Sequence, residues 1–164
     1  MDGNRLARKV GTLLALLLAA ALSTLQGEEK SGDLAAARAL FEKNLQAIRD
    51  KNRDAYLSCY LDSERLARTG PEGSELGYAG LAAAAGKGWP DHIAADDIHL
   101  TPVQPGIVYG TYRYRVRYGG REDAGLSERL FVKTPKGWKI AVSTAFSSLP
   151  GVPKHFYDEN VGFA

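Results

Sequence analysis

The spacing of apolar residues predicts helices in the first half of the chain. Between residues 33 and 50 they recur every three or four positions, which is the period of one helical face. We therefore predict an amphipathic helix there, with Asp33 as its N-cap. Lys51 and Asn52 interrupt the pattern, and a second helix is expected over residues 53–61.

A different period governs the second half. A short third helix is expected over residues 78–85, and beyond Trp89-Pro90 apolar and polar residues alternate, as in half-buried strands. A short strand is also expected near residues 65–69. The long predicted strands cover residues 92–103, 107–118, 126–133 and 138–146. Helices followed by consecutive antiparallel strands predict an α+β fold, and long hairpins predict a strongly curved sheet that forms a cone over the helices and encloses a pocket.

The first residues have the order of a secretory signal. Basic residues precede an uncharged Leu- and Ala-rich run over residues 10–22, and Ala21 and Ser23 occupy the small-residue positions of a cleavage site. The run is shorter than the roughly 20 apolar residues that span a bilayer, so no permanent membrane span is expected. We predict a signal peptide over residues 1–23 and export to the periplasm or cell exterior, with retention as an anchor left open.

The remaining chain fits one domain. We expect a linker over residues 24–32, a domain over residues 33–149 and an extended tail over residues 150–164. Removal of residues 1–23 leaves 18 basic and 18 acidic residues, so the formal net charge of +2 becomes zero. The basic character belongs to the signal, and we expect no nucleic-acid partner.

Glu128 is the best candidate for a catalytic base. It shares a strand face with Leu126, Leu130 and Val132, so it faces an apolar environment if those residues point inward. The alternative is that Glu128 pairs with an arginine of a neighbouring strand. Asp91-His92 is a weaker candidate, because adjacent strand residues point to opposite faces.

Aromatic residues are the candidates for lining a pocket. A tyrosine offers an apolar ring and a hydroxyl that can orient a ligand, although ordinary core packing would explain the same residues. The predicted pocket-lining set is Tyr56, Tyr60, Tyr78, Trp89, Tyr112, Tyr114 and Thr144. We expect no metal and no cofactor, because the sequence has no phosphate-cradling Gly loop, no dinucleotide fingerprint and no set of zinc ligands.

Three segments carry a resemblance to a known family. They are the helical pair over residues 34–60, the Gly-Tyr-Ala-Gly-Leu sequence at 77–81, and the strand, turn and Gly-Trp-Lys-Ile sequence within 129–140. Together they resemble the nuclear transport factor two-like superfamily, in particular its SnoaL-like and calcium/calmodulin kinase association-type bacterial domains. The resemblance implies a cystatin-like architecture with an apolar pocket and a homodimer formed through the sheet.

The resemblance leaves function open, because the superfamily contains both enzymes and binding modules. Many SnoaL-like sequences carry a His in the last strand, where this chain has Val142, Ser143 and Thr144. The leading hypothesis is a non-catalytic domain that binds a small apolar ligand or mediates dimerisation. One alternative is a proton-transfer enzyme (isomerase, dehydratase or cyclase) with Glu128 as base and Tyr56, Tyr60 or Tyr112 as donor. Another is a pure oligomerisation module whose own rings fill the pocket.

Overall fold

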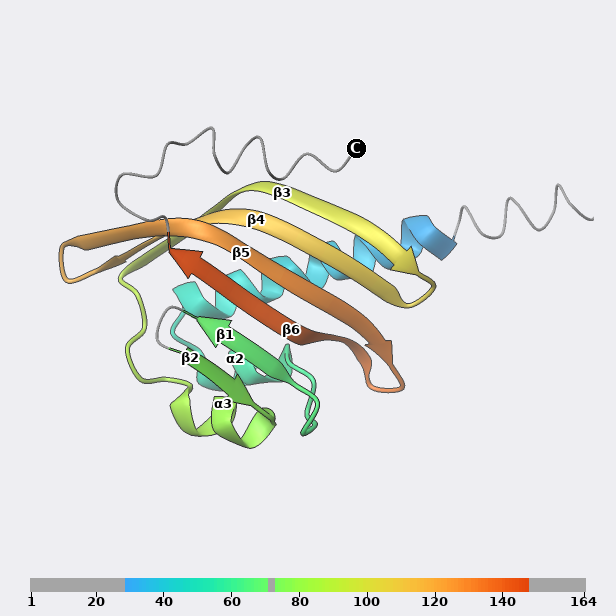
Figure 1. Ribbon diagram of the computed structural model, residues 1–164, viewed down its shortest axis with the longest axis horizontal. Coiled ribbons are helices and arrows are strands. Elements are labelled where there is room, and N and C mark those ends of the chain that lie inside the picture. The colour runs from blue at the N-terminus through green and yellow to red at the C-terminus, as the bar shows by residue number, and fades with distance from the viewer. Residues whose placement is uncertain (1–28, 71–72, 148–164) are drawn as a thin grey trace, which may run out of the picture.

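Helices packed against one six-stranded sheet make up the fold (Figure 1). The computed structural model describes residues 29–70 and 73–147. A long helix over residues 29–49 crosses one face of the sheet, and α2 (Arg53–Ser58) and α3 (Tyr78–Ala84) follow it in the chain. The predicted α+β class is confirmed. The predicted signal and C-terminal tail lie outside the described residues, whereas residues 29–32 of the predicted linker are already helical.

The sheet has the order β2-β1-β6-β5-β4-β3 and is not closed. Its strands are β1 (Ala67–Gly70), β2 (Gly73–Leu76), β3 (His92–Gln104), β4 (Ile107–Tyr118), β5 (Arg121–Thr134) and β6 (Gly137–Ser147). The four long strands and the short β1 match the predictions, and β2 is an addition to them. Neighbours are antiparallel except β1 and β6, which pair in parallel, so the sheet is mixed.

Local contacts explain where the first helices differ from their predicted bounds. Asp33 is not an N-cap, because it lies inside the long helix and its buried carboxylate accepts a hydrogen bond from the Gly106 amide at 2.7 Å. The predicted break is confirmed, and Asn52 caps α2 by accepting from the Ala55 amide at 3.0 Å. Helix α2 ends early because the backbone of Cys59 accepts a hydrogen bond from the Ile140 amide of β6.

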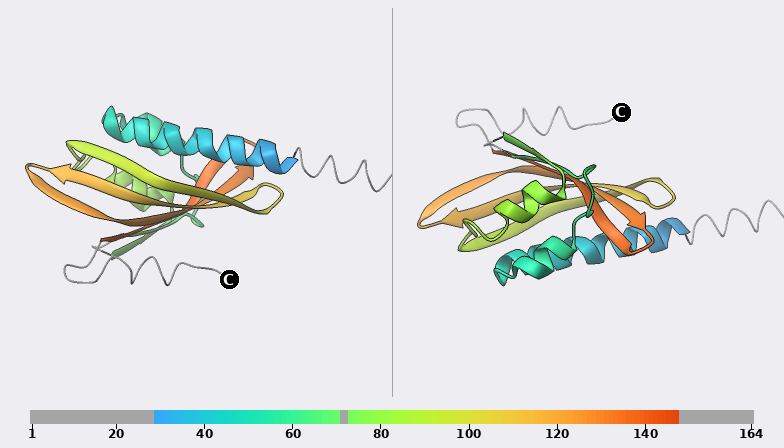
Figure 2. Two further views of the ribbon diagram at one scale, coloured as in Figure 1. Left: turned by 90° about the horizontal axis from the view of Figure 1, so that it is seen from above. Right: turned by 90° about the horizontal axis from the view of Figure 1, so that it is seen from below.

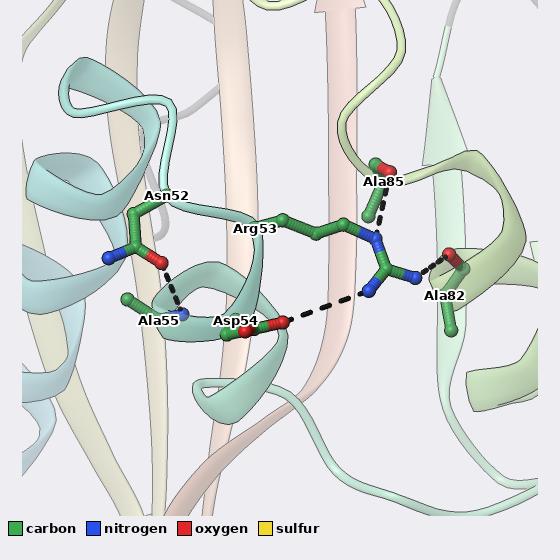
Figure 3. A network of polar contacts seen from close by, with 6 residues as sticks. All are labelled: Asn52, Arg53, Asp54, Ala55, Ala82 and Ala85. Atoms are coloured by element: carbon green, nitrogen blue, oxygen red, sulfur yellow. Dashed lines mark hydrogen bonds and ion pairs between the residues drawn. The ribbon is translucent and has the colours of Figure 1, made fainter.

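Arg53 joins the two short helices (Figure 3). It leaves the first turn of α2, and its guanidinium donates to the carbonyls of Ala82 at 2.7 Å and Ala85 at 3.2 Å, at the end of α3. These carbonyls have no partner within the helix, and a cation is favourable at a helix C-terminus. The Arg53–Asp54 pair, at 3.8 Å, is exposed and adds little.

The sheet has an inner face toward the long helix and an outer face that no described helix covers (Figure 2). The Phe41 ring of the long helix meets the Tyr112 ring of β4 edge to face at 4.8 Å, which identifies the inner face. Ser127 of β5 pairs with Tyr112, and successive residues of β5 alternate between the two faces. Ser127, Arg129 and Phe131 are therefore buried on the inner face. The apolar core fills the space between this face and the helices. Within the described residues, no helix is long and apolar enough to cross a membrane.

Candidate functional site

Two arginines lie in one row across the inner face. Strand register pairs Arg68 of β1 with Ser143 of β6, and Ser143 with Arg129 of β5. Residues paired across neighbouring strands point to the same face. Both arginines therefore lie on the side of the sheet that packs against the helices, which is unusual for charged residues.

Arg129 is the most deeply buried cation in the described chain, with 7 % of its surface exposed. One terminal nitrogen donates to the Tyr112 hydroxyl at 2.6 Å, and the other donates to the Ser127 hydroxyl at 2.7 Å and to the Glu128 carbonyl at 2.9 Å. Its guanidinium also lies 5.2 Å from the centre of the Tyr112 ring. Its Nε has no hydrogen-bond partner among the described residues.

Tyr56 of α2 and Tyr60, which follows α2, complete the site. The hydroxyl of Tyr60 donates to that of Tyr56 at 3.0 Å, and both rings are buried. The Tyr56 ring also meets Trp89 edge to face at 5.3 Å. Burial raises the pKa of Tyr56 well above its usual value of 10.0, so its hydroxyl stays protonated. Tyr56, Tyr60, Arg68, Tyr112 and Arg129 are called the arginine–tyrosine cluster below.

The cluster carries an uncompensated positive charge. Arg68 pairs with Glu75 of β2 at 3.1 Å. Among the described residues, no carboxylate pairs with Arg129. Burial acts to lower the pKa of Arg129, but Tyr112, Tyr60 and Tyr56 act to raise it and prevail, so the guanidinium is charged. A buried cation without a counter-ion is costly, and sites that keep one are candidates for binding.

The interior beside Arg129 is tightly packed. A narrow gap between atoms lies between the long helix and β3, β4 and β5. Its walls leave no room for a water molecule in the present conformation. Its lining includes Phe41, Ile98, Leu100 and Phe131 together with Tyr112 and Arg129.

The structure brings together only part of the predicted pocket-lining set. Tyr56, Tyr60 and Tyr112 belong to the arginine–tyrosine cluster, Trp89 packs on Tyr56, and the partly buried Tyr78 packs against the same core. Tyr114 is buried on the inner face two positions further along β4, with its hydroxyl 3.5 Å from that of Ser147.

Glu128 and Thr144 lie elsewhere, which corrects their predicted placement. They pair across β5 and β6 on the outer face, and the Thr144 hydroxyl donates to Glu128 Oε2 at 3.0 Å. Tyr109 donates to Glu128 Oε1 at 2.6 Å. Burial and this carboxylate raise the pKa of Tyr109 to about 12. Glu128 is therefore separated by the sheet from Tyr112, one of its predicted proton donors, and it pairs with no arginine of the described chain.

The other acid candidates are turn and surface residues. Asp91 accepts from the Gly119 amide at 2.7 Å and closes the turn between β4 and β5. His92 is exposed at the start of β3. In the described part of the chain, no three His, Cys, Asp or Glu side chains are grouped as metal ligands.

Arg68 and Arg129 were missed by the sequence reasoning. The candidate role of Glu128 depends on Leu126, Leu130 and Val132 pointing inward, whereas they lie on the outer face. The Gly119-Gly120 sequence contains the information needed to predict the face of Arg129. A two-residue turn there pairs Tyr118 with Arg121, and the resulting register puts Arg129 on the same face as Tyr112.

Comparison with known proteins places this geometry in a class. No family model and no curated protein matches the chain by sequence. Solved structures do match. An NTF-2 like protein of unknown function from Shewanella oneidensis is 18 % identical with a TM-score of 0.61, over 68 % of this chain and 96 % of its own.

Two further structures extend the comparison. Hexachlorocyclohexane dehydrochlorinase (LinA, type 2) is 14 % identical with a TM-score of 0.62, over 77 % of this chain and 99 % of its own. A protein of unknown function with a cystatin-like fold from Nostoc punctiforme is 11 % identical with a TM-score of 0.59, over 73 % and 92 %. The chain therefore has the NTF2-like fold, a fold compatible with ligand binding or catalysis.

Proposed function

We propose that this domain binds a small molecule between the long helix and the inner face of the sheet, without catalysing a reaction. One observation carries the proposal: Arg129 is buried and charged, has no carboxylate partner among the described residues, and leaves its Nε without a hydrogen bond. A folded protein that keeps such a group forgoes stability. A ligand that pairs with it offsets that cost.

The composition of the cluster favours binding over proton-transfer catalysis. A general base needs a carboxylate or imidazole within hydrogen-bond reach of the substrate. The hydrogen bonds of the cluster join tyrosine, serine, arginine and backbone groups, and no described carboxylate or imidazole contacts the tyrosine hydroxyls. Glu128, the predicted base, lies on the outer face.

Purification from the native host tests the proposal. We expect mass spectrometry of the freshly purified protein to detect a bound small molecule that denaturation releases. The matched control is the Arg129→Met variant prepared in the same way, which should lose that molecule. The opposite result is a native protein that carries no small molecule and binds none from a metabolite collection. That result would favour an interaction module whose interior is filled by its own aromatic side chains.

The outer face supports a second part of the proposal, a homodimer. Leu126, Leu130 and Val132 are half-buried there without a covering helix in the described chain, and Phe146 is 51 % exposed. We expect light scattering to give twice the chain mass, and a Leu130→Lys variant to give the monomer mass. Lys87→Glu changes charge at an exposed position in the turn after α3, away from the outer face, and serves as the control.

Export is the third part, supported by the basic, apolar and small-residue order of residues 1–23. We expect the mature protein in the periplasm or medium to begin at Thr24. N-terminal sequencing decides this, because a chain that still begins at Met1 in the cytoplasm would contradict it.

A further inference from the structure

We infer that the ligand of this site is a small monocarboxylic acid with an apolar body, whose carboxylate pairs with Arg129. The inference rests on the proposed function and specifies the class of ligand. It follows from three features of the interior: the charge on Arg129, the geometry of its partners, and the apolar space next to it.

The hydrogen bonds of Arg129 leave its charge unmatched. Its terminal nitrogens contact hydroxyl and carbonyl oxygens, which are neutral, and its Nε contacts no acceptor. A guanidinium presents its donors in a planar fork that matches a carboxylate, and such pairs are stronger than bonds to neutral groups. A carboxylate would therefore bind Arg129 more strongly than its present neutral partners do.

A single negative charge fits better than two. Arg68, the other cation of the cluster, already pairs with Glu75 at 3.1 Å. The cluster with Glu75 thus has one positive charge in excess. A monocarboxylate would neutralise it, whereas a phosphate dianion would bury an additional negative charge at considerable cost.

The side chains next to Arg129 favour an apolar body. Phe41, Ile98, Leu100 and Phe131 line the narrow gap beside it, so a ligand body that packs there meets apolar side chains. Because the walls are closed to water, the ligand must displace them on entry. Ile98 and Leu100 belong to the edge strand β3, where Ile98 lies within one register shift and a second shift follows Leu100. Because β3 pairs with β4 alone, this wall has fewer strand neighbours than the walls formed by β4 and β5.

Benzoate and benzamide are the probes that test the inference. They have the same ring and nearly the same size, but only benzoate is charged. We expect calorimetry at pH 7 to show benzoate binding about tenfold or more tightly, since charge-assisted hydrogen bonds are roughly twice as strong as neutral ones. In an NMR spectrum of the arginine side chains, benzoate should shift the Nε–H signal of Arg129.

Three variants make the test specific. Arg129→Met should remove the preference for benzoate, and it should fold because an apolar residue replaces a buried ion without loss of packing. Tyr112→Phe keeps the cation but removes its hydroxyl partner, and it should keep the preference. Arg117→Met is the matched control: it removes an exposed arginine from β4 and should leave both affinities unchanged.

The failures of the two proposals are distinguishable. Equal binding of benzoate and benzamide, or a preference that persists in Arg129→Met, would overturn the carboxylate assignment and leave small-molecule binding in place. If neither probe binds and the native protein carries no small molecule, both proposals are wrong. A native ligand that is neutral would overturn this inference alone.

Discussion

At the scale of single residues, the hydrogen bonds of Arg129 differ from the others in the interior because they involve a charge. A buried hydrogen bond that involves a charge contributes more than a neutral one, and removing one partner leaves the other desolvated and unsatisfied. The Tyr112 hydroxyl is the acceptor at 2.6 Å for one terminal nitrogen of Arg129. The Tyr56–Tyr60 hydrogen bond, in contrast, joins two neutral groups.

These two hydrogen bonds should therefore differ in their effect on stability. We expect Tyr112→Phe to lower the free energy of unfolding by about 1–3 kcal/mol, because it leaves a charged donor without a partner. Tyr60→Phe should cost about 0.5–1.5 kcal/mol. Urea denaturation followed by circular dichroism measures both. Equal losses would mean that Arg129 finds another acceptor.

Tyr109 on the outer face makes a pH-dependent contribution to the stability of the fold. Its pKa is about 12 in the folded protein, against 10.0 for an unperturbed tyrosine, so its protonated form is favoured by folding. The contribution is complete below pH 10 and is lost as the pH rises toward 12, because the unfolded chain releases the proton first. We expect Tyr109→Phe to show a shallower loss of stability across this interval.

The measurement is denaturant unfolding at several pH values between 8 and 12. The other raised tyrosine pKa values, those of Tyr56 and Tyr114, remain in the variant, so its curve should still fall. Identical slopes for the wild type and Tyr109→Phe would show that the hydrogen bond to Glu128 does not persist in solution.

At the scale of secondary-structure elements, two strands approach closely where the sequence has glycine. A Cβ at Gly125 of β5 would overlap the Phe146 carbonyl oxygen of β6. At Gly110 of β4, the Cβ would meet the side chains of Leu100 and Phe131 at 2.8 and 3.0 Å. A backbone atom is displaced less readily than a side chain, so a larger residue is tolerated less well at Gly125 than at Gly110.

We expect Gly125→Ala to cause the larger loss, by separating β5 from β6, and Gly110→Ala to cost about 1–3 kcal/mol as an overpacked site. Gly80→Ala is the control. Gly80 is exposed within α3 with open space around it, so alanine should stabilise by up to about 1 kcal/mol. Thermal unfolding ranks the three variants, and a different order would contradict the packing described.

The Arg53 side chain holds α3 against α2. With its bonds to Ala82 and Ala85 removed, the last carbonyls of α3 lose their partners. We expect Arg53→Met to increase amide hydrogen exchange in α3 while that of the long helix stays unchanged. Asp54→Asn, which removes only an exposed ion pair, should exchange like the wild type.

Element types were predictable from sequence because they depend on local periodicity, whereas the faces of β5 were not. Strands β3 to β6 follow from alternation and from the turns between them. Both faces of β5 contain apolar residues, so alternation alone could not separate Leu130 from Phe131. The register across the Gly119-Gly120 turn resolves this, since it ties Arg129 to the face of Tyr112.

At the scale of the whole molecule, β6 joins two parts of the chain that are distant in sequence. It pairs in parallel with β1, more than seventy residues earlier, and antiparallel with β5. No local pattern predicts a pairing over this distance, which is why the expected sheet was purely antiparallel. The same pairing aligns Arg68 with Arg129 through Ser143, so the site exists only in the complete sheet.

A chain that stops after Lys136 should therefore fail to fold. It lacks β6, which leaves β1 without a partner in the main sheet and exposes the edge of β5. We expect the truncated chain to lose its near-ultraviolet circular dichroism and its cooperative thermal transition, with the full chain as reference. A cooperative transition in the truncated chain would show that β3 to β5 and the long helix suffice.

The two ends of the sheet restrict how copies of the molecule can associate. An exposed edge strand is a template for pairing with another chain. At one end β2 has four residues, and at the other β3 carries Asp96 and Asp97, a register shift beside them, and Pro102, which has no amide hydrogen to donate. Such features oppose edge-to-edge growth into fibrils. The edges therefore disfavour association of copies, which leaves the outer face, where we propose the homodimer, as the surface for it.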